Sequence, residues 1–465
     1  MQSAGAVLLA SAGVGGQRGA AAYDAFEKSI SELQSDMVAG RTTAAELVRY
    51  YRRRIEALDQ AGPELNAVIA LHPQADAMAR ALDAERRSGR TRGPLHGIPV
   101  LLKDNLDTKD MPTTNGSLTF KGFRPLHDAF QVAKLRAAGA VIIGKTVTTE
   151  CAYYHPGPTR NPHDLSRTPG GSSSGSAAAV AAEMVPLAIG SQTNGSVIRP
   201  AAFCGVYGVK PTHGTISRYG AMLLSRALDH VGTFARSLAD SALLLEVLAG
   251  HDPHDPDTRP IAAPNFMAMA ADEPEAPPRL AFVRTPVWDR ADTDTHAAFG
   301  GLVAELGHDL EEVALPDDFA AAWDDHRAVM ATDMAHNLGA MVARGGESGS
   351  SEALRAIIAE GGATNALRYL AARDNAKHYR QGIIDVLAGF DAIITPATVG
   401  VAPVGDATGS PLFCSLWSLS GVPSITLPLL TGESGMPIGV QLIGAPGDDA
   451  RLLRTANWLV QRLAG

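Results

Sequence analysis

Helical periodicity dominates the first part of the chain. Between residues 23 and 90, apolar positions recur every three to four residues in FEKSISELQSDMV, in TTAAELVRYYRRRIEAL and in DAMARALDAERRSG. The second segment opens with threonines, which suit a helix N-terminus because the side-chain oxygen can accept a free backbone N–H. We therefore predict a group of N-terminal helices over residues 23–90 that packs outside a sheet.

Short β-branched runs follow these helices. GIPVLLK and AVIIGKT flank the helical pattern of HDAFQVAKLRAAG, and strand character returns in FDAIITPA, PSITLPLL and MPIGVQLIGA. A helical pattern closes the chain from Asp448 onward. Because strands that alternate with helices build α/β folds, the pattern predicts a predominantly parallel core to which both ends of the chain contribute.

Two regions differ from this alternation. Residues 260–388 are rich in alanine and in loop residues, with little strand signal after LAFVRTP, which predicts a helical insertion or lid inside a single domain spanning 23–465. Residues 1–22 contain a short apolar stretch without a preceding Lys or Arg. That pattern fits a disordered tail or a leader remnant. We expect a cytoplasmic protein, or a secreted or periplasmic one if the segment is a leader.

Composition excludes some classes of partner. The 465 residues are 45% hydrophobic and 19% charged, which is typical of a globular protein with a large core. The formal net charge of −9 gives no electrostatic reason to expect nucleic acid or anionic lipid. No apolar run in the sequence approaches the roughly 20 residues that a bilayer requires. We expect a small-molecule substrate, no nucleic acid and no membrane association, and a homodimer is left open.

The thiol and imidazole groups do not predict a metal site. Cys151, Cys204 and Cys414 lie far apart in the sequence and form no CxxC pair, so reduced, buried thiols are expected. The fourteen histidines include no HExxH, and His251 and His254 fall in the turn-like HDPHDP. We therefore expect no metal and no cofactor.

Three segments carry candidate chemistry, each with a plainer interpretation. GGSSSGSAAAVAA runs from a glycine-serine turn into a helix, although GGSSSGS alone is typical of a flexible linker. In QTNGSVIRPAAF, Asn194 and Gly195 tolerate positive φ, so backbone N–H groups can form an oxyanion hole beside Ser196, which can equally be a turn residue. In GIPVLLKDN, the Lys103 ammonium either reaches water or, if buried, loses its proton near neutral pH and serves as a base.

A fourth segment suggests a different function. GAVIIGKT, residues 139–146, matches the phosphate-loop pattern GxxxxGK[ST]. Its four intervening residues are apolar and mostly β-branched, which favours a strand over a loop whose amides wrap phosphate. We therefore predict a strand there and no nucleotide site.

Together the three candidate segments resemble the amidase signature family of serine hydrolases. The resemblance also includes ARSLADSALLLEVLAGHDPHDP, GVPSITLPLL and PIGVQLIG, and it covers about 66–255 and 390–461. It implies the amidase signature fold, with a mixed, mostly parallel sheet flanked by helices on both faces. It places the nucleophile on Ser196, a bridging serine with a cis peptide bond on Ser172, and the base on Lys103.

The family's spacing selects Ser172 over Ser173 and Ser174 as the bridging residue. The resemblance further implies an oxyanion hole that is built from four successive backbone N–H groups, those of Thr193, Asn194, Gly195 and Ser196.

The implied reaction is hydrolysis of a carboxamide, either an aryl acylamide or a primary or peptide amide, or of a carbamate (urethane), through a serine acyl-enzyme. Esters are expected side substrates. Loops around Tyr153, Tyr154, residues 212–227 and Trp417, together with the helical insertion, are expected to contribute to the substrate pocket. The alternative is an amidotransferase subunit of a multi-subunit, tRNA-dependent complex, because the family includes such subunits. An acidic chain without a basic stripe favours the freestanding hydrolase.

Several positions depart from the commoner family pattern. Ser174 stands where the family usually has glycine, and Gln192 and Asn194 stand where it often has aspartate and glycine. Arg199 is one place further along than in the usual motif, and a common C-terminal asparagine is replaced near Ser418. These changes leave the three reactive positions filled but alter their surroundings.

Overall fold

In the described part of the chain, eleven strands form one sheet. The computed structural model describes residues 23–260 and 264–464; the predicted tail or leader remnant, residues 1–22, lies outside the described residues. The strands follow the order β1-β3-β2-β4-β6-β5-β10-β11-β9-β7-β8 across the sheet. Their bounds are β1 (Val68–Leu71), β2 (Pro99–Lys103), β3 (Val141–Thr146), β4 (Leu187–Gln192), β5 (Tyr207–Lys210), β6 (His230–Ala235), β7 (Leu280–Val283), β8 (Leu310–Val313), β9 (Ala392–Pro396), β10 (Ser424–Thr431) and β11 (Pro437–Ile443).

The sheet is mixed, as predicted. Parallel pairing joins β2 to β3 and β4, and it joins β7 to β8 and β9. The remaining pairs are antiparallel, so the parallel pairing is confined to these two blocks of three strands. Because β4 and β5 both run antiparallel to β6, the carboxyl ends of β2, β4 and β5 lie along one edge of the sheet, where candidate side chains collect.

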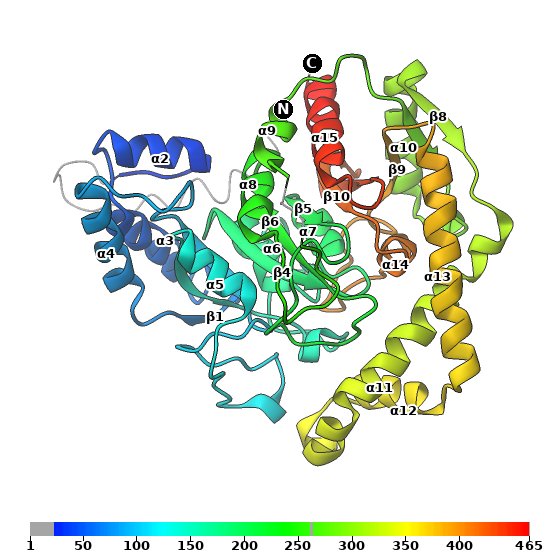
Figure 1. Cartoon of the computed structure of the whole chain (residues 1–465), viewed down its shortest axis with the longest axis horizontal. Helices are drawn as coiled ribbons and strands as arrows, with labels where there is room; N and C mark the ends of the chain where they lie inside the picture. The colour runs from blue at the N-terminus through cyan, green and yellow to red at the C-terminus, as the bar shows by residue number, and fades with distance from the viewer. Residues whose placement is uncertain (1–22, 261–263, 465) are drawn as a thin grey trace.

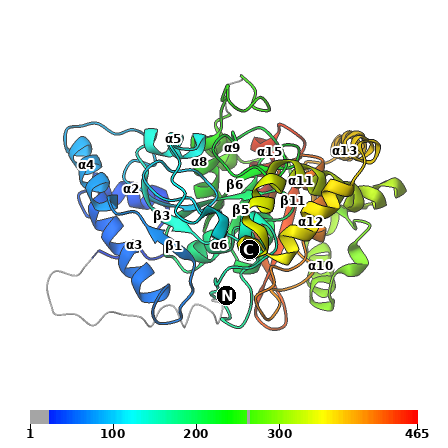
Figure 2. The ribbon, with the colours of Figure 1, turned by 90° about the horizontal axis from the view of Figure 1, so that it is seen from below.

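Helices cover both faces of this sheet, as predicted. Their bounds are α2 (Ile30–Val38), α3 (Ala44–Leu58), α4 (Ala75–Arg87), α5 (Phe130–Ala137), α6 (Ser174–Ala181), α7 (Ile198–Cys204), α8 (Leu238–Leu248), α9 (Phe266–Ala271), α10 (Thr293–Leu306), α11 (Ala322–Gly349), α12 (Glu352–Ala363), α13 (Ala366–Leu387), α14 (Leu412–Leu419) and α15 (Asp449–Ala464). Helices α6 and α7 pack on the central strands β4, β5 and β10, and α8 and α15 also pack on central strands. Helices α2–α4 and α11–α13 lie at opposite ends of the molecule (Figures 1 and 2).

The N-terminal helical prediction needs one correction. Residues 23–90 form α2, α3 and α4, and Thr43 caps α3 by accepting the Glu46 backbone N–H. The same segment also contains β1, which pairs antiparallel with β3 at the edge of the sheet. Four residues are too short a run for its alternation to stand out between two helices.

The segment 260–388 also needs a correction. It contains α9–α13, as a helical insertion or lid would, but it contributes β7 and β8 to the sheet as well. The sequence of β8 is LEEV, and its two central glutamates are exposed. An edge strand that faces solvent lacks the apolar run by which buried strands are recognised.

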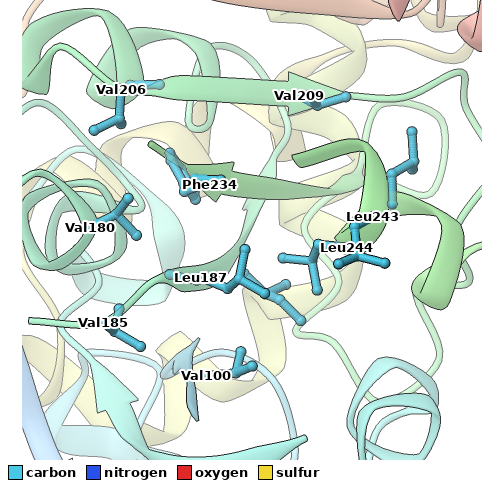
Figure 3. Close-up of a cluster of buried hydrophobic side chains, with 14 of the residues drawn as sticks. Val100, Val180, Val185, Leu187, Val206, Val209, Phe234, Leu243 and Leu244 are labelled. Atoms are coloured by element: carbon cyan, nitrogen blue, oxygen red, sulfur yellow. The ribbon is translucent and has the colours of Figure 1, made fainter. Parts of the chain in front are cut away.

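The largest hydrophobic cluster joins the sheet to its helices. Side chains of α6, β4, β6 and α8 pack together in it, including those of Val180, Leu187, Phe234 and Leu244 (Figure 3). A second cluster lies around α11, α13 and α14, beyond the carboxyl ends of the central strands. Among residues 23–260 and 264–464, no helix is both long enough and apolar enough to cross a bilayer.

Glycines let helix α7 approach the sheet closely. A Cβ added at Gly208 of β5 would lie 2.5 Å from the Ala201 Cβ, and one added at Gly439 of β11 would lie 2.6 Å from the Ala202 Cβ. Both distances are too short for real carbon contacts. The missing side chains therefore set the depth of α7, the helix that begins two residues after Ser196.

We expect Gly208→Ala to lower the free energy of unfolding by about 1–3 kcal/mol, because overpacking forces α7 away from the sheet. Gly300→Ala is the matched control, since a Cβ at this position of α10 meets nothing within 4 Å. It should be neutral or stabilising by up to about 1 kcal/mol, because alanine favours helix more than glycine does. Urea denaturation measures both values; equal midpoints for the two variants would contradict the close approach.

Candidate active site

Lys103 ends β2 and points its amine into a buried polar cluster. Its side chain is fully buried, and Nζ lies 2.7 Å from the Ser172 Oγ. The same amine donates to the Ser191 Oγ at 2.9 Å, and Asn105 Nδ2 donates to that hydroxyl at 2.9 Å. The lysine is thus held by two serine hydroxyls at the edge of the sheet where the carboxyl ends of β2 and β4 lie.

Burial holds the pKa of Lys103 well below its ordinary value. Removal from water disfavours the ammonium form, and the charge of Asp229 opposes this effect without cancelling it. No carboxylate in the described residues forms an ion pair with this amine. The amine is therefore suited to be neutral, and to accept a proton, near neutral pH.

The three neighbouring serines of GGSSSGS occupy different positions. Ser172 follows a cis peptide bond from Gly171 and contacts Lys103. The Ser173 hydroxyl donates to the Ser191 carbonyl at 3.2 Å, and the Ser174 hydroxyl donates to the Val147 carbonyl at 3.4 Å. In the described structure, Ser172 is the one of the three whose hydroxyl reaches the lysine.

Ser196 lies in the turn between β4 and α7. The Gln192 Oε1 accepts the backbone N–H groups of Val197 and Ile198, at 2.8 and 3.0 Å, and so ties the end of the strand to the start of the helix. The four preceding N–H groups, Thr193, Asn194, Gly195 and Ser196, have no acceptor among the described residues. Free N–H groups in one tight turn are the donors that an oxyanion hole requires.

Helix α14 supports this turn from the far end of the sequence. Ser418 donates to the Asn194 carbonyl at 2.5 Å, and its hydroxyl accepts from Gln192 Nε2 at 3.0 Å. Ser415 donates to the Asn194 Oδ1 at 2.8 Å. Gln192, Asn194 and Ser418 are three of the departures from the common family pattern, and here they contact one another.

Asp229 supports the same turn from the start of β6. Its Oδ1 accepts the Thr193 hydroxyl at 2.6 Å, and its Oδ2 accepts the backbone N–H groups of Leu224 and Ser225 at 2.8 and 3.1 Å. Burial raises the pKa of this carboxyl to about 6, although the hydrogen bonds lower it. The residue therefore connects the turn to the loop that precedes β6.

A small cavity brings the predicted reactive residues together. Its volume is about 20 Å³, close to that of one water molecule, and both Ser172 and Ser196 line it. No hydrogen bond joins these two hydroxyls within residues 23–260 and 264–464. The other lining residues are Ala152, Tyr153, Tyr154, Thr193, Asn194, Arg199, Leu224 and Met330.

Two of the three predicted pocket residues reach this cavity. Tyr153 and Tyr154 line it and pack edge to face, with ring centroids 4.8 Å apart. Trp417 does not line it, because its side chain is 1% exposed and lies within the hydrophobic cluster around α11, α13 and α14. The replacement of the family's asparagine near Ser418 suggested that Trp417 shapes the pocket, but its position on α14 turns the ring toward the core.

Arg199 lines the cavity, and few polar groups contact its guanidinium. Its Nη2 donates to the Gly171 carbonyl at 2.6 Å, and its guanidinium lies 5.9 Å from the Tyr154 ring centroid. Nε and Nη1 are buried and have no hydrogen-bond partner in the described residues. The shift of this arginine by one position in the motif therefore still leaves it at the cavity that Ser172 and Ser196 line.

Ser191 is a site residue that the sequence analysis missed. It lies in LAIGSQ on β4, where alternation predicts no special role, yet its hydroxyl contacts both Lys103 and Asn105. The signal that could have found it is its place at the carboxyl end of a strand next to β2. We expect it to be a positioning residue for the amine.

Ser191→Ala should lower kcat by about 10–100-fold, a loss typical of residues that orient a reactive group. The substitution removes one oxygen partner of the Lys103 amine, so the pH dependence of kcat/KM should shift as well. Ser191→Thr keeps the hydroxyl and should recover most of the activity. A pH–rate profile checks the assignment; an unshifted profile with full kcat in the alanine variant would contradict it.

The segment that resembles a phosphate loop forms a strand, as predicted. Residues Val141–Thr146 are β3, and all six are buried. The Lys145 amine donates to the Leu106 carbonyl at 2.8 Å and lies 3.3 Å from the Asp104 Oδ1.

Across the described ranges, no three His, Cys, Asp or Glu side chains form a group that could hold a metal ion.

Comparison with known proteins gives consistent matches over almost the whole chain. A family model described as Amidase matches residues 46–453. A glutamyl-tRNA(Gln) amidotransferase subunit of Anaeromyxobacter sp. (strain K) is 36% identical over 480 residues, covering 93% of this chain and 96% of that protein. The corresponding subunit of Acidothermus cellulolyticus is also 36% identical and covers 93% of each chain.

Solved structures match at similar coverage. The native peptide amidase from Stenotrophomonas maltophilia superposes with a TM-score of 0.84 at 34% identity, over 95% of this chain and 98% of that one. A 6-aminohexanoate cyclic dimer hydrolase has a TM-score of 0.81 at 29% identity, over 94% and 97% of the two chains.

Proposed function

This chain belongs to the amidase signature family of amidohydrolases, and from that membership we propose that it hydrolyses a carboxamide through a serine acyl-enzyme. Ser196 is the nucleophile, Ser172 is the bridging hydroxyl and Lys103 is the base. The observation that carries this assignment is the 2.7 Å contact between the Lys103 amine and the Ser172 hydroxyl, next to a turn with four N–H groups that have no acceptor among the described residues.

The proton moves along the three side chains. The neutral amine of Lys103 accepts a proton from the Ser172 hydroxyl, which accepts the proton of Ser196 as the Ser196 Oγ bonds to the carbonyl carbon. The carbonyl oxygen becomes an oxyanion that the N–H groups of residues 193–196 stabilise. When the C–N bond breaks, Ser172 returns a proton to the departing nitrogen and Lys103 replaces it, which leaves the acyl group on Ser196.

Deacylation repeats the same steps with water. Water loses a proton through Ser172 to Lys103, attacks the acyl carbon, and releases the acid while Ser196 regains its proton. Ser172 and Ser196 share the cavity without a mutual hydrogen bond, and catalytic contacts often tighten when substrate binds. Tyr153 and Tyr154 line the cavity, and a volume of about 20 Å³ is too small for an acyl group, so lining side chains must move to admit one.

The substrate class is a carboxamide with a carbamate or ester as a secondary substrate. A panel of an aryl acylamide, a primary amide, a peptide amide, a carbamate and an ester tests this with the purified chain. Amine or ammonia release from at least one amide is expected, and added hydroxylamine should divert the acyl group to a hydroxamate. Absence of amide hydrolysis, or turnover without any hydroxamate, would contradict the acyl-enzyme.

The similarity to amidotransferase subunits supports a second candidate, a component of a tRNA-dependent complex. Several relatives that bear this name match 92–93% of this chain at 34–36% identity. A glutaminase assay of the chain alone distinguishes the two candidates. Activity on small amides without added partners supports the freestanding hydrolase, whereas glutamine hydrolysis that appears when the other amidotransferase components are added supports membership of the complex.

A further inference from the structure

A second and larger cavity lies beside the catalytic one. Its volume is about 680 Å³, within the range usual for small-molecule sites, and α11, α13, α14 and the loop before β6 enclose it. Leu223 and Val329 line it, whereas their chain neighbours Leu224 and Met330 line the catalytic cavity. One layer of chain therefore separates the two spaces, at the end of the molecule where α11 and α13 lie (Figure 1).

The wall that α13 contributes is cationic. Tyr369, Arg373, Lys377 and Arg380 recur at the spacing of one helix face, and all four line the cavity. Arg373 donates to the Tyr369 hydroxyl at 3.0 Å and makes no ion pair with any described residue, and Lys377 pairs with the exposed Asp374. Arg380 is partly buried, and within the described ranges it has neither a hydrogen bond nor an ion pair. Burial lowers the pKa of this guanidinium from its usual value.

The acidic groups of the cavity are already engaged elsewhere. Asp257 pairs with Arg226 at 3.0 Å and also with the buried Arg218. Asp333 accepts the Ser225 hydroxyl at 2.5 Å and the Tyr369 hydroxyl at 2.8 Å. The charges of Arg373 and Arg380 therefore have no carboxylate partner in the described part of the protein.

Two histidines, His213 and His336, also line the cavity, and neither can neutralise the charge of the arginines. His213 Nε2 lies 2.7 Å from an Arg218 nitrogen and 3.1 Å from the Arg226 carbonyl, and burial lowers the pKa of this imidazole to about 4. The cavity thus remains positive with His213 neutral. Its apolar wall consists of Leu223, Ala227, Leu228, Val329, Ala376 and Leu419.

We propose that this cavity binds a small organic dianion, a dicarboxylate, whose two ends are held by Arg373 and Arg380. A guanidinium binds a carboxylate through two parallel hydrogen bonds, which suits uncompensated arginines. The two arginines are separated by about 10 Å along the helix axis, given the rise per residue, so two separate anionic groups fit better than one. The apolar wall accommodates the carbon chain between them. This site is independent of the catalytic proposal.

Isothermal titration of the full chain at constant ionic strength tests the site with pimelate, with heptanoate and with inorganic phosphate. Heptanoate has the same number of carbons as pimelate but one carboxylate. We expect pimelate to bind at least tenfold more tightly than either other probe. Arg373→Gln/Arg380→Gln should weaken pimelate binding at least tenfold, and Ser196→Ala should leave it unchanged.

Arg279→Gln is the matched control, because Arg279 is exposed, pairs with Glu311 of the edge strand β8 and does not line the cavity. It should bind pimelate like the wild type. If the double variant does not fold, Arg380→Lys, which keeps a cation, should bind more tightly than Arg380→Gln. Equal affinity for all three probes, equal affinity of the Arg380 variants, or loss of binding in Ser196→Ala would overturn the proposal.

Discussion

Replacing Ser196 by alanine is expected to lower kcat for amide hydrolysis by about 10³-fold or more, because the variant lacks the hydroxyl that forms the acyl-enzyme. Stability should change little. The Ser196 Oγ has no hydrogen-bond partner within the described ranges, so its removal leaves no buried polar group unsatisfied. Steady-state kinetics on the best substrate of the panel measures the loss, and urea denaturation checks the fold.

Ser174→Ala is the matched control for this prediction. Ser174 belongs to the same polar region, but its hydroxyl donates to the Val147 carbonyl and lies away from the Lys103 amine. This variant should keep kcat within about threefold of the wild type, since it removes one weak neutral hydrogen bond. A Ser196→Ala enzyme that keeps most of its kcat, or a Ser174→Ala enzyme that loses as much, would refute the assignment of the nucleophile.

Lys103→Met should be as damaging to kcat as loss of the nucleophile, because methionine fills similar space without a basic nitrogen. In the wild type, kcat/KM should fall as pH is lowered through the depressed pKa of Lys103, since the protonated amine cannot accept the Ser172 proton. A pH–rate profile of the wild type, together with kcat of the variant, measures both effects. A profile that is flat down to the pH of unfolding would contradict the role of the amine.

Lys103→Met should also change the free energy of unfolding, by an amount that depends on pH. The pKa of Lys103 is lower in the folded state than in the unfolded state, so folding releases a proton and the wild type gains stability as pH rises between the two values. Methionine has no such cost. The stability of Lys103→Met relative to the wild type should therefore be greatest at low pH and decrease toward the ordinary lysine pKa.

Lys210→Met separates the effect of a buried lysine on stability from its effect on catalysis. Lys210 is fully buried, its amine donates to the Val422 carbonyl, and burial lowers its pKa to about 7. The variant should show the same decrease in relative stability between about pH 7 and the ordinary lysine pKa, but it should keep its amidase kcat. Loss of activity equal to that of Lys103→Met would mean that any buried lysine is required for the fold.

The sequence predicted the helices better than the order of the strands. Thr43 and the apolar spacing that follows it located α3, and β-branched runs located β2, β3, β9, β10 and β11. Local patterns do not record which strands pair. Antiparallel β6 enters between β4 and β5 through contacts such as Gly190 with Gly232, whose lack of side chains is a feature of packing and not of periodicity.

For the site, the sequence identified side chains at marked turns and missed those on plain strands. Lys103, Ser172 and Ser196 belong to recognisable segments, and the structure gathers them at one cavity or beside it. Ser191 carries no such mark, because its role depends on the register of β4 beside β2. Trp417 was assigned to the pocket because it adjoins Ser418, near which the family's asparagine is replaced, whereas the orientation of α14 decides where its ring lies.

The dependence of the Ser196 turn on α14 has a consequence for synthesis of the protein. Asn194 and Gln192 are held by Ser415 and Ser418, which leave the ribosome more than two hundred residues later. A nascent chain that has emerged only as far as β9 has all three reactive side chains but lacks the α14 hydroxyls that orient the turn. Under the proposed mechanism, an oriented Ser196 turn therefore requires a nearly complete chain.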